Sequence, residues 1–255
     1  TPRRPPSFLY CCLSDCSGCS NAGGAVLKLD QIRLEQGEFQ LFADTVFEEG
    51  IITALMGASG SGKSTLLAAI AGFLPPASGR ITVDGKDITD LPPGERPLSL
   101  LFQDQNLFPH LTVAQNVGLG LRPDLRLTSD QKIARDSVLE RVGLTGMGNR
   151  LPRDLSGGQQ SRAALARALL RGRPWLLLDE PFSALGPALR SEMLTLLRDT
   201  AKSEGLSVLM VTHAPEDARM IADRTALISD GVLEPPVATG ALFDDPTPAL
   251  RAYLG

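Results

Sequence analysis

The chain has no cysteine after residue 19, no long apolar run and no excess of positive charge. Its four cysteines lie within residues 11–19, so the body of the fold cannot depend on disulfide bonds, which suits a reducing compartment. No apolar run approaches the roughly 18 residues of a membrane-spanning helix, so we expect any membrane association to involve a partner or the protein surface. The apolar patch at 8–13 is also too short for the core of a secretory signal.

The charge balance argues against a nucleic-acid partner. The sequence has 25 Lys and Arg against 29 Asp and Glu, which gives a formal net charge of −4. Proteins that grip DNA or RNA through the phosphate backbone usually carry a clustered basic face. We therefore expect no nucleic acid among the partners.

Composition divides the chain at about residue 25. Residues 1–25 show no periodic pattern, and we predict a disordered tail there, followed by one folded domain over 26–255. Cys12, Cys16 and Cys19 have the C-x-x-x-C-x-x-C spacing of a zinc or cluster ligand set, but we favour the tail interpretation. A chain of 255 residues with 43% hydrophobic content is long enough to bury a full core.

The strongest local signal is a glycine-rich loop that follows the apolar run 51–56 and opens into a helix-like segment. It fits the pattern G-x-x-x-x-G-K-[ST] at every specified position. Inward-facing backbone N–H groups and the helix N-terminus favour a nucleotide triphosphate, with the lysine on the terminal phosphates and the next hydroxyl on Mg²⁺. A chance Gly/Ser-rich turn is the alternative, which the flanking strand and helix signals disfavour. The predicted ATP-binding residues are Gly57, Ala58, Ser59, Gly60, Ser61, Gly62, Lys63, Ser64 and Thr65.

Strand-like and helix-like segments alternate along the remaining chain. We expect strands near 27–34, 39–47, 80–83, 98–102, 175–178, 207–211 and 226–229. We expect helices near 113–121, 130–142, 156–170, 187–203 and 215–221, and no more than a terminal segment in the final ten residues. This order predicts an α/β P-loop NTPase fold with a mostly parallel core sheet, a small antiparallel β layer and a helical lobe inserted at about 109–172.

Two carboxylates follow the apolar strand 175–178. Ligands bind at the C-terminal edge of parallel sheets, so Asp179 is expected to hold a magnesium ion together with Ser64. Glu180 then stands where it can orient and deprotonate an attacking water. The alternative is an acidic pair that caps the next turn.

A further motif precedes the helix at 156–170. Ser156 is a good N-cap, and two glycines beside it leave N–H groups free for an anion. By itself the motif describes only a capped helix. Its residues are Leu155, Ser156, Gly157, Gly158 and Gln159.

In this order, the motifs resemble those of ABC-transporter ATPases. The glycine loop corresponds to Walker A, Gln103 to the Q-loop, 155–159 to the signature, Asp179 and Glu180 to Walker B, and His213 to the switch histidine. The resemblance covers roughly residues 26–245. A lone histidine at the end of a strand is more often structural, so His213 is a candidate only as a member of this set.

The resemblance implies a homodimer in which each ATP lies between the glycine loop of one subunit and the signature residues of the other. Gln103 would contact the Mg²⁺ ion and the attacking water, and His213 the γ-phosphate. The implied partners are two transmembrane permease subunits and, through them, a periplasmic solute-binding protein. The protein would be peripheral, on the cytoplasmic face of the inner membrane.

Segments at 71–79, 96–103, 106–120 and 187–196 look like the ATP-binding subunits of bacterial thiamine importers. We therefore expect ATP hydrolysis coupled to thiamine import. Other importer ATPases, for iron, sulfate or a similar solute, share part of this pattern. A non-transport ABC clamp in repair or translation is a third interpretation, although such proteins have paired cassettes or long coiled coils that residues 1–255 do not show. A binding module that has lost turnover is a fourth.

Two positions depart from the family pattern. Gly186 stands where aspartate is usual, which puts contact between the two ATP sites in doubt, and we expect Gly186 and Pro187 to start a helix instead. The adenine ring is usually stacked on an aromatic residue ahead of the glycine loop. The stretch 34–36 has none, and Phe39, equally well placed for the core, is the nearest candidate.

Overall fold

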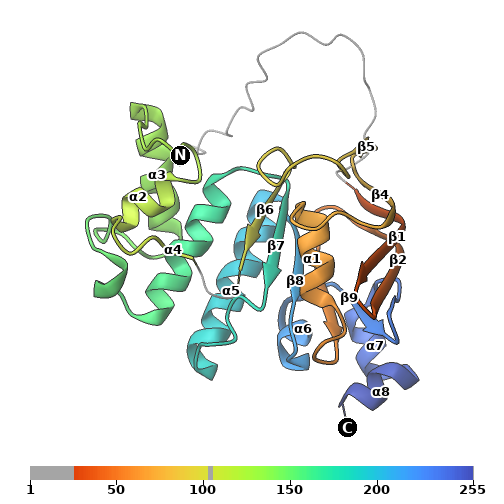
Figure 1. Cartoon of the computed structure of the whole chain (residues 1–255). Coiled ribbons are helices and arrows are strands. Elements are labelled where there is room, and N and C mark those ends of the chain that lie inside the picture. The colour runs from red at the N-terminus through yellow and green to blue at the C-terminus, as the bar shows by residue number, and fades with distance from the viewer. Residues whose placement is uncertain (1–25, 103–105, 255) are drawn as a thin grey trace, which may run out of the picture.

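The computed structural model describes residues 26–102 and 106–254. Parallel strands lie in the middle of the molecule, antiparallel strands at one end and a group of helices at the other (Figure 1). All the described strands belong to one sheet in the order β5-β4-β1-β2-β10-β9-β3-β8-β7-β6, with β11 paired to β9. The predicted α/β class with a mostly parallel core is confirmed. The predictions for residues 1–25, the cysteines included, lie outside the described residues.

The antiparallel part is built around β1, which pairs antiparallel with β2 and with β4. On β1, Leu27 and Leu29 are buried before a bulge and Ile32 and Leu34 after it, so the period-two pattern of a sheet with one covered face resumes beyond the extra residue. The short β10 pairs with both β2 and β9, so the antiparallel part continues into the parallel core. These strands are β1 (Leu27–Gln36), β2 (Phe39–Phe47), β4 (Ser78–Val83), β5 (Lys86–Asp87), β10 (Val232–Leu233) and β11 (Val237–Ala238).

The parallel core is covered on both faces, which is why its strands read as continuous apolar runs. Leu177 on β7 and Leu209 on β8 pack with α1, whereas their neighbours Leu176 and Val208 pack with α4 and α5 on the opposite face. The strands are β3 (Ile52–Gly57), β6 (Leu98–Leu101), β7 (Trp175–Asp179), β8 (Ser207–Val211) and β9 (Arg224–Ser229), and the helices are α1 (Lys63–Ala71), α4 (Gly157–Leu170), α5 (Pro187–Glu204) and α6 (Pro215–Ile221).

Three helices within the stretch 109–172 share a separate apolar cluster. Each begins at a hydroxyl residue whose side chain accepts from the N–H of a glutamine three residues on: Thr112, Thr128 and Ser156. The helices are α2 (Val113–Gly118), α3 (Ser129–Arg141) and α4, with a 3₁₀ turn at Pro152–Asp154. Over the described ranges, none of the helices is both long enough and apolar enough to cross a membrane.

The final residues form more than a terminal segment, so that expectation was wrong. Helices α7 (Thr239–Asp244) and α8 (Pro248–Leu254) close the described chain. Leu250 is fully buried in a cluster with Met56 and Leu227. This apolar anchor in a short amphipathic stretch holds α8 against the core.

A buried arginine secures the C-terminal end of α1. The side chain of Arg96 is 1% exposed and donates hydrogen bonds to the carbonyl oxygens of Ala69, Ile70, Thr89 and Leu91. The first two carbonyls belong to the last turn of α1, where the helix dipole favours a cation. Arg96 thus connects the helix that follows the glycine loop to the segment that leads into β6.

We predict that Arg96→Met lowers the free energy of unfolding by about 3 kcal/mol, because buried carbonyls lose their charged donor. Urea unfolding followed by circular dichroism measures the change. Arg80→Met is the matched control, since the Arg80 side chain is 74% exposed, and it should cost less than about 0.5 kcal/mol. Equal losses in the two variants would contradict the role given to Arg96.

Candidate functional site

The predicted site residues are carried by one edge of the parallel sheet. Strands β3, β8 and β7 are parallel neighbours, so their C-terminal ends meet. Gly57 ends β3, Asp179 ends β7, and Thr212 and His213 follow β8. The glycine loop, both carboxylates and the histidine therefore come from adjacent strand ends.

The glycine loop packs against an aromatic ring from β2. Gly62 has a φ of 96°, and a Cβ atom there would lie 2.3 Å from the ring of Phe39. No other residue fits that position without a shift of the ring. Phe39, the candidate for the adenine-stacking residue, thus borders the loop and also packs against the core. Next to it in the loop, the hydroxyl of Ser61 is buried and has no hydrogen-bond partner among the described atoms.

Lys63 is a nearly buried cation at the first position of α1. It is 7% exposed, and its Nζ donates to the carbonyl oxygens of Gly57 and Ala58, at 2.8 Å each. Burial lowers the pKa of Lys63, and the negative charges of Glu180 and Asp179 oppose that shift. Lys63 therefore sits between the loop carbonyls and two carboxylates.

Ser64 and Asp179 bring two oxygen ligands together. The Oγ of Ser64 donates to Oδ1 of Asp179 at 3.1 Å, although the residues are 115 positions apart. Burial raises the pKa of Asp179, the hydrogen bond from Ser64 opposes this, and the charge of Glu180 adds to it. A hydroxyl and a partly buried carboxylate are donors that suit Mg²⁺.

Glu180 has an unusual backbone. Its φ is 45°, in the left-handed region that favours glycine. Its N–H donates to the carbonyl of Val211, at 3.1 Å, and its Oε2 lies 2.9 Å from Nδ1 of His213. Such conformations cost of order 1–3 kcal/mol and persist where the surrounding structure imposes them. The residue with this strained backbone is the one predicted to deprotonate the attacking water.

The loop that carries His213 is held by a buried polar group. Asp217 accepts from the hydroxyl of Thr212 at 3.0 Å and forms an ion pair with Arg190 on α5. The same hydroxyl accepts from the N–H of Ala214. The imidazole of His213 is 54% exposed, so it can meet a ligand in front of Glu180.

A cavity of about 600 Å³ opens at this edge, a size that suits a nucleotide. Sequence reasoning missed two of its residues. Gln36 lies in the stretch 34–36, where only an aromatic side chain was expected, and Tyr253 lies far from every recognisable motif. The lining residues are Gln36, Phe39, Gly57, Ser59, Gly60, Gly62, Lys63, Ser64, Thr65, Glu180, His213 and Tyr253.

The signature residues lie at the N-terminus of α4, outside the lining of this cavity. Ser156 caps the helix, and its hydroxyl accepts from the N–H of Gln159. A Cβ atom on Gly158 would lie 2.5 Å from Leu189, so a glycine lets α4 and α5 approach closely. None of the five signature residues is among the described residues that line the 600 Å³ cavity. Gln103 lies outside the described residues.

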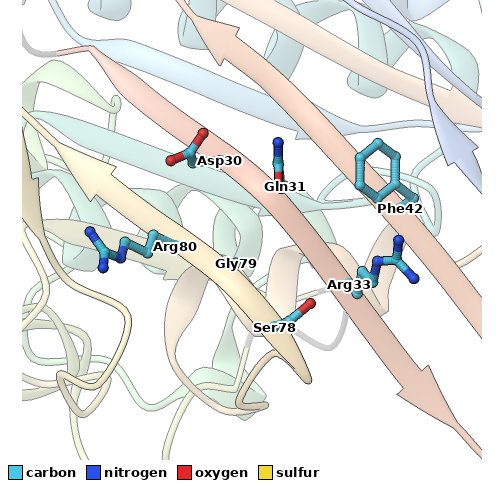
Figure 2. A pocket seen from close by; sticks show the side chains of 7 residues that line it. All are labelled: Asp30, Gln31, Arg33, Phe42, Ser78, Gly79 and Arg80. Atoms are coloured by element: carbon cyan, nitrogen blue, oxygen red, sulfur yellow. The ribbon is translucent and has the colours of Figure 1, made fainter.

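A second cavity, of about 480 Å³, lies on the antiparallel strands at the bulge of β1. Figure 2 shows its side chains, which come from β1, β2 and β4 and include two arginines and an aspartate. It contains none of the residues predicted from the sequence motifs. The lining residues are Asp30, Gln31, Arg33, Phe42, Ser78, Gly79 and Arg80.

Comparison with known proteins agrees with this geometry. Residues 43–183 match a family model described as ABC transporter. A thiamine import ATP-binding protein, ThiQ, of Cereibacter sphaeroides is 60% identical over 230 residues, which is 90% of this chain and all of that protein. The ThiQ of Escherichia coli K12 is 50% identical over 206 residues, 81% of this chain and 89% of that protein.

Solved structures are similar as well. An ATP-binding cassette of an ABC transporter in its ADP conformation superposes with a TM-score of 0.81 at 25% identity, over 91% of this chain and 99% of that chain. A dimeric ATP-binding cassette in a post-hydrolysis state, bound to ADP and Pi, gives a TM-score of 0.70 at 32% identity, over 84% of this chain and 98% of that chain.

We predict that Asp179→Asn stabilises the nucleotide-free protein at pH 7. Because burial raises the folded-state pKa of Asp179, the ionised carboxylate destabilises the fold above that pKa. The penalty disappears as the pH falls through the folded-state pKa toward the ordinary value of 3.8. The asparagine oxygen still accepts from Ser64. Thermal unfolding at several pH values should therefore show a rise in Tm at neutral pH that fades in acid.

The control for this measurement is Asp199→Asn on α5, since the side chain of Asp199 is 64% exposed. It should leave Tm within about 1 °C at every pH. A lower Tm for Asp179→Asn at pH 7 would show that the carboxylate stabilises the apo fold, which would contradict the prediction.

Proposed function

The chain belongs to the ABC transporter family, and we propose that it is the ATP-hydrolysing subunit of an importer for a small solute, namely thiamine. The observation that carries the proposal is the convergence of Lys63, Ser64, Asp179, Glu180 and His213 at one sheet edge around a nucleotide-sized cavity. Residues 26–255 form a single ATPase domain in this proposal, with its helical lobe at 109–172.

The loop from Gly57 to Thr65 holds the phosphates of ATP. Its N–H groups and the N-terminus of α1 supply positive potential, and Lys63 exchanges its two carbonyl contacts for the terminal phosphates. The buried hydroxyl of Ser61 gains an acceptor in the same step. Phe39 forms the wall nearest the base.

Glu180 is the general base. Its carboxylate takes a proton from the attacking water, and His213, 2.9 Å away, holds that carboxylate in place and reaches the γ-phosphate. Gln103 contributes to the position of the same water. The residue with the role of base is the one whose backbone has the unusual φ of 45°.

Ser64 and Asp179 would hold the magnesium ion. Their oxygens, 3.1 Å apart, offer a hydroxyl and a carboxylate to a hard cation, with Gln103 as a further ligand. When bound, the ion neutralises charge on the phosphates. Burial and the charge of Glu180 raise the pKa of Asp179, and a bound cation would favour its ionised form.

The working form is a homodimer in which Leu155, Ser156, Gly157, Gly158 and Gln159 complete the site of the second copy. Two features support this: the cavity in one chain lacks these residues, and Gly157 is exposed at the N-terminus of α4, a position that favours an anion. The similar cassette at 32% identity, with ADP and Pi bound, is itself dimeric.

Two permease subunits hold the dimer on the cytoplasmic face of the inner membrane, and a periplasmic solute-binding protein delivers the cargo. Exposed aromatic side chains support a docking role. Phe73, Phe102 and Phe108 are exposed, and the rings of Phe73 and Phe102 stack edge to face at 5.8 Å. Large exposed apolar groups that gather in this way are typical of interaction surfaces.

Glu180→Gln should bind ATP normally and lower the turnover number by about 100-fold or more, because it removes the base but keeps the size of the side chain. Nucleotide-binding fluorescence and steady-state hydrolysis measure the two quantities. Size-exclusion chromatography with ATP should also show a trapped dimer. Glu95→Gln, at an exposed turn, is the control and should behave as wild type. Undiminished turnover in Glu180→Gln would refute the assignment.

The solute is tested by reconstitution with the membrane partners. We predict that thiamine, with its binding protein, stimulates ATP hydrolysis in proteoliposomes, because substrate delivery and hydrolysis are coupled in an importer. Iron and sulfate, the competing cargoes, are the matched controls and should give no stimulation. Stimulation by either of them instead would keep the ATPase assignment and overturn the choice of thiamine.

A further inference from the structure

Helix α8 carries a tyrosine that contacts the backbone of His213. The hydroxyl of Tyr253 donates to the backbone carbonyl oxygen of His213 at 2.6 Å, although the two residues are 40 positions apart. Leu250, one turn earlier on α8, is fully buried, and the ring of Tyr253 packs partly against the same apolar cluster. The contact therefore joins α8, which the buried Leu250 anchors, to the loop after β8.

The other hydrogen bonds that hold the backbone around His213 come from residues close to it in sequence. On its N-terminal side, Thr212 donates to Asp217 and accepts from Ala214, so the backbone on either side of His213 is held. The imidazole itself is half exposed and meets the carboxylate of Glu180 at 2.9 Å. Tyr253 bonds to the carbonyl group attached to the Cα atom of His213, the atom from which the imidazole side chain projects.

Tyr253 also borders the nucleotide cavity, together with Lys63 and Glu180. Burial raises the pKa of its hydroxyl, and the negative charges of Glu180 and Glu216 add to this. The hydroxyl is thus protonated throughout the neutral range and remains a hydrogen-bond donor.

We propose that Tyr253 is a positioning residue for ATP hydrolysis: its hydroxyl fixes the peptide carbonyl of His213 and so holds the imidazole against Glu180, while its ring forms one wall of the nucleotide cavity. The inference rests on the proposed function for the role of His213. It assigns a part in the site to α8, which carries none of the family motifs.

The hydroxyl and the ring have separable effects. Tyr253→Phe keeps the wall and removes the donor, so kcat should fall about fivefold, as expected for one lost hydrogen bond, while KM for ATP stays within about twofold. Tyr253→Ala removes both and should change kcat and KM together. Arg251→Ala is the matched control on the same helix, since its side chain is 66% exposed and pairs with the exposed Asp245, and it should behave as wild type.

A second readout does not depend on activity. The chain has two histidines, so in an untagged His110→Gln background the imidazole C2 proton resonance belongs to His213. Adding Tyr253→Phe should shift this resonance, whereas adding Arg251→Ala should leave it in place, with Tm unchanged in both. A merely structural role for α8 would lower Tm without this selective shift.

The outcomes separate the inference from the proposed function. If Tyr253→Phe has wild-type kcat and leaves the His213 resonance unmoved, the inference is overturned while the ATPase assignment stands. If the wild type hydrolyses no ATP but the resonance still shifts, the contact is real and the proposed function fails. A fall in kcat with an unmoved resonance would also overturn the inference, because the hydroxyl would then act by another route.

Discussion

The site depends on the register of three parallel strand ends. Beyond the last strand residues, the N–H of Glu180 donates to the carbonyl of Val211, and the N–H of Thr212 donates to the carbonyl of Leu55. These two bonds tie β7 to β8 and β8 to β3 at the point where the chains leave the sheet. A shift of one residue in any of the three strands would exchange its two faces and remove a predicted site residue from the edge.

Charge at this edge is concentrated and only partly solvated. Lys63 is nearly buried, and Asp179 and Glu180 are both partly buried beside it. Burial shifts the pKa of Lys63 down and that of Asp179 up, so each group is less stable in its charged form than it would be in water. An anionic ligand relieves the first shift and a cation the second. In the proposed function, a metal-bound triphosphate would therefore stabilise these charges better than the protein alone does.

Much of this arrangement could be predicted from the sequence because the decisive signals are local. A strand, a glycine-rich loop and a helix occupy consecutive residues, and the pair Asp179 and Glu180 directly follows an apolar strand, so neighbours in sequence are neighbours in the site. The left-handed φ of Glu180 had no such signal, since glutamate rarely adopts it and the N–H of Glu180 contacts Val211 on another strand. The position of α8 was missed for the same reason: Leu250 anchors it in a cluster of distant residues, and its contact with His213 spans 40 positions.

The walls and the floor of the nucleotide-sized cavity come from different kinds of segment. The floor consists of motif residues, whose identity the proposed contacts with phosphate and water would restrict. The walls come from both ends of the described chain, Phe39 on β2 and Tyr253 on α8, which are held by packing in the antiparallel part and in the cluster around Met56. The motifs therefore indicate the reaction, whereas the walls of the cavity come from segments that carry no motif. The hydrogen bond from Tyr253 to the backbone carbonyl of His213 connects the two sets, because it joins a wall residue to a motif residue.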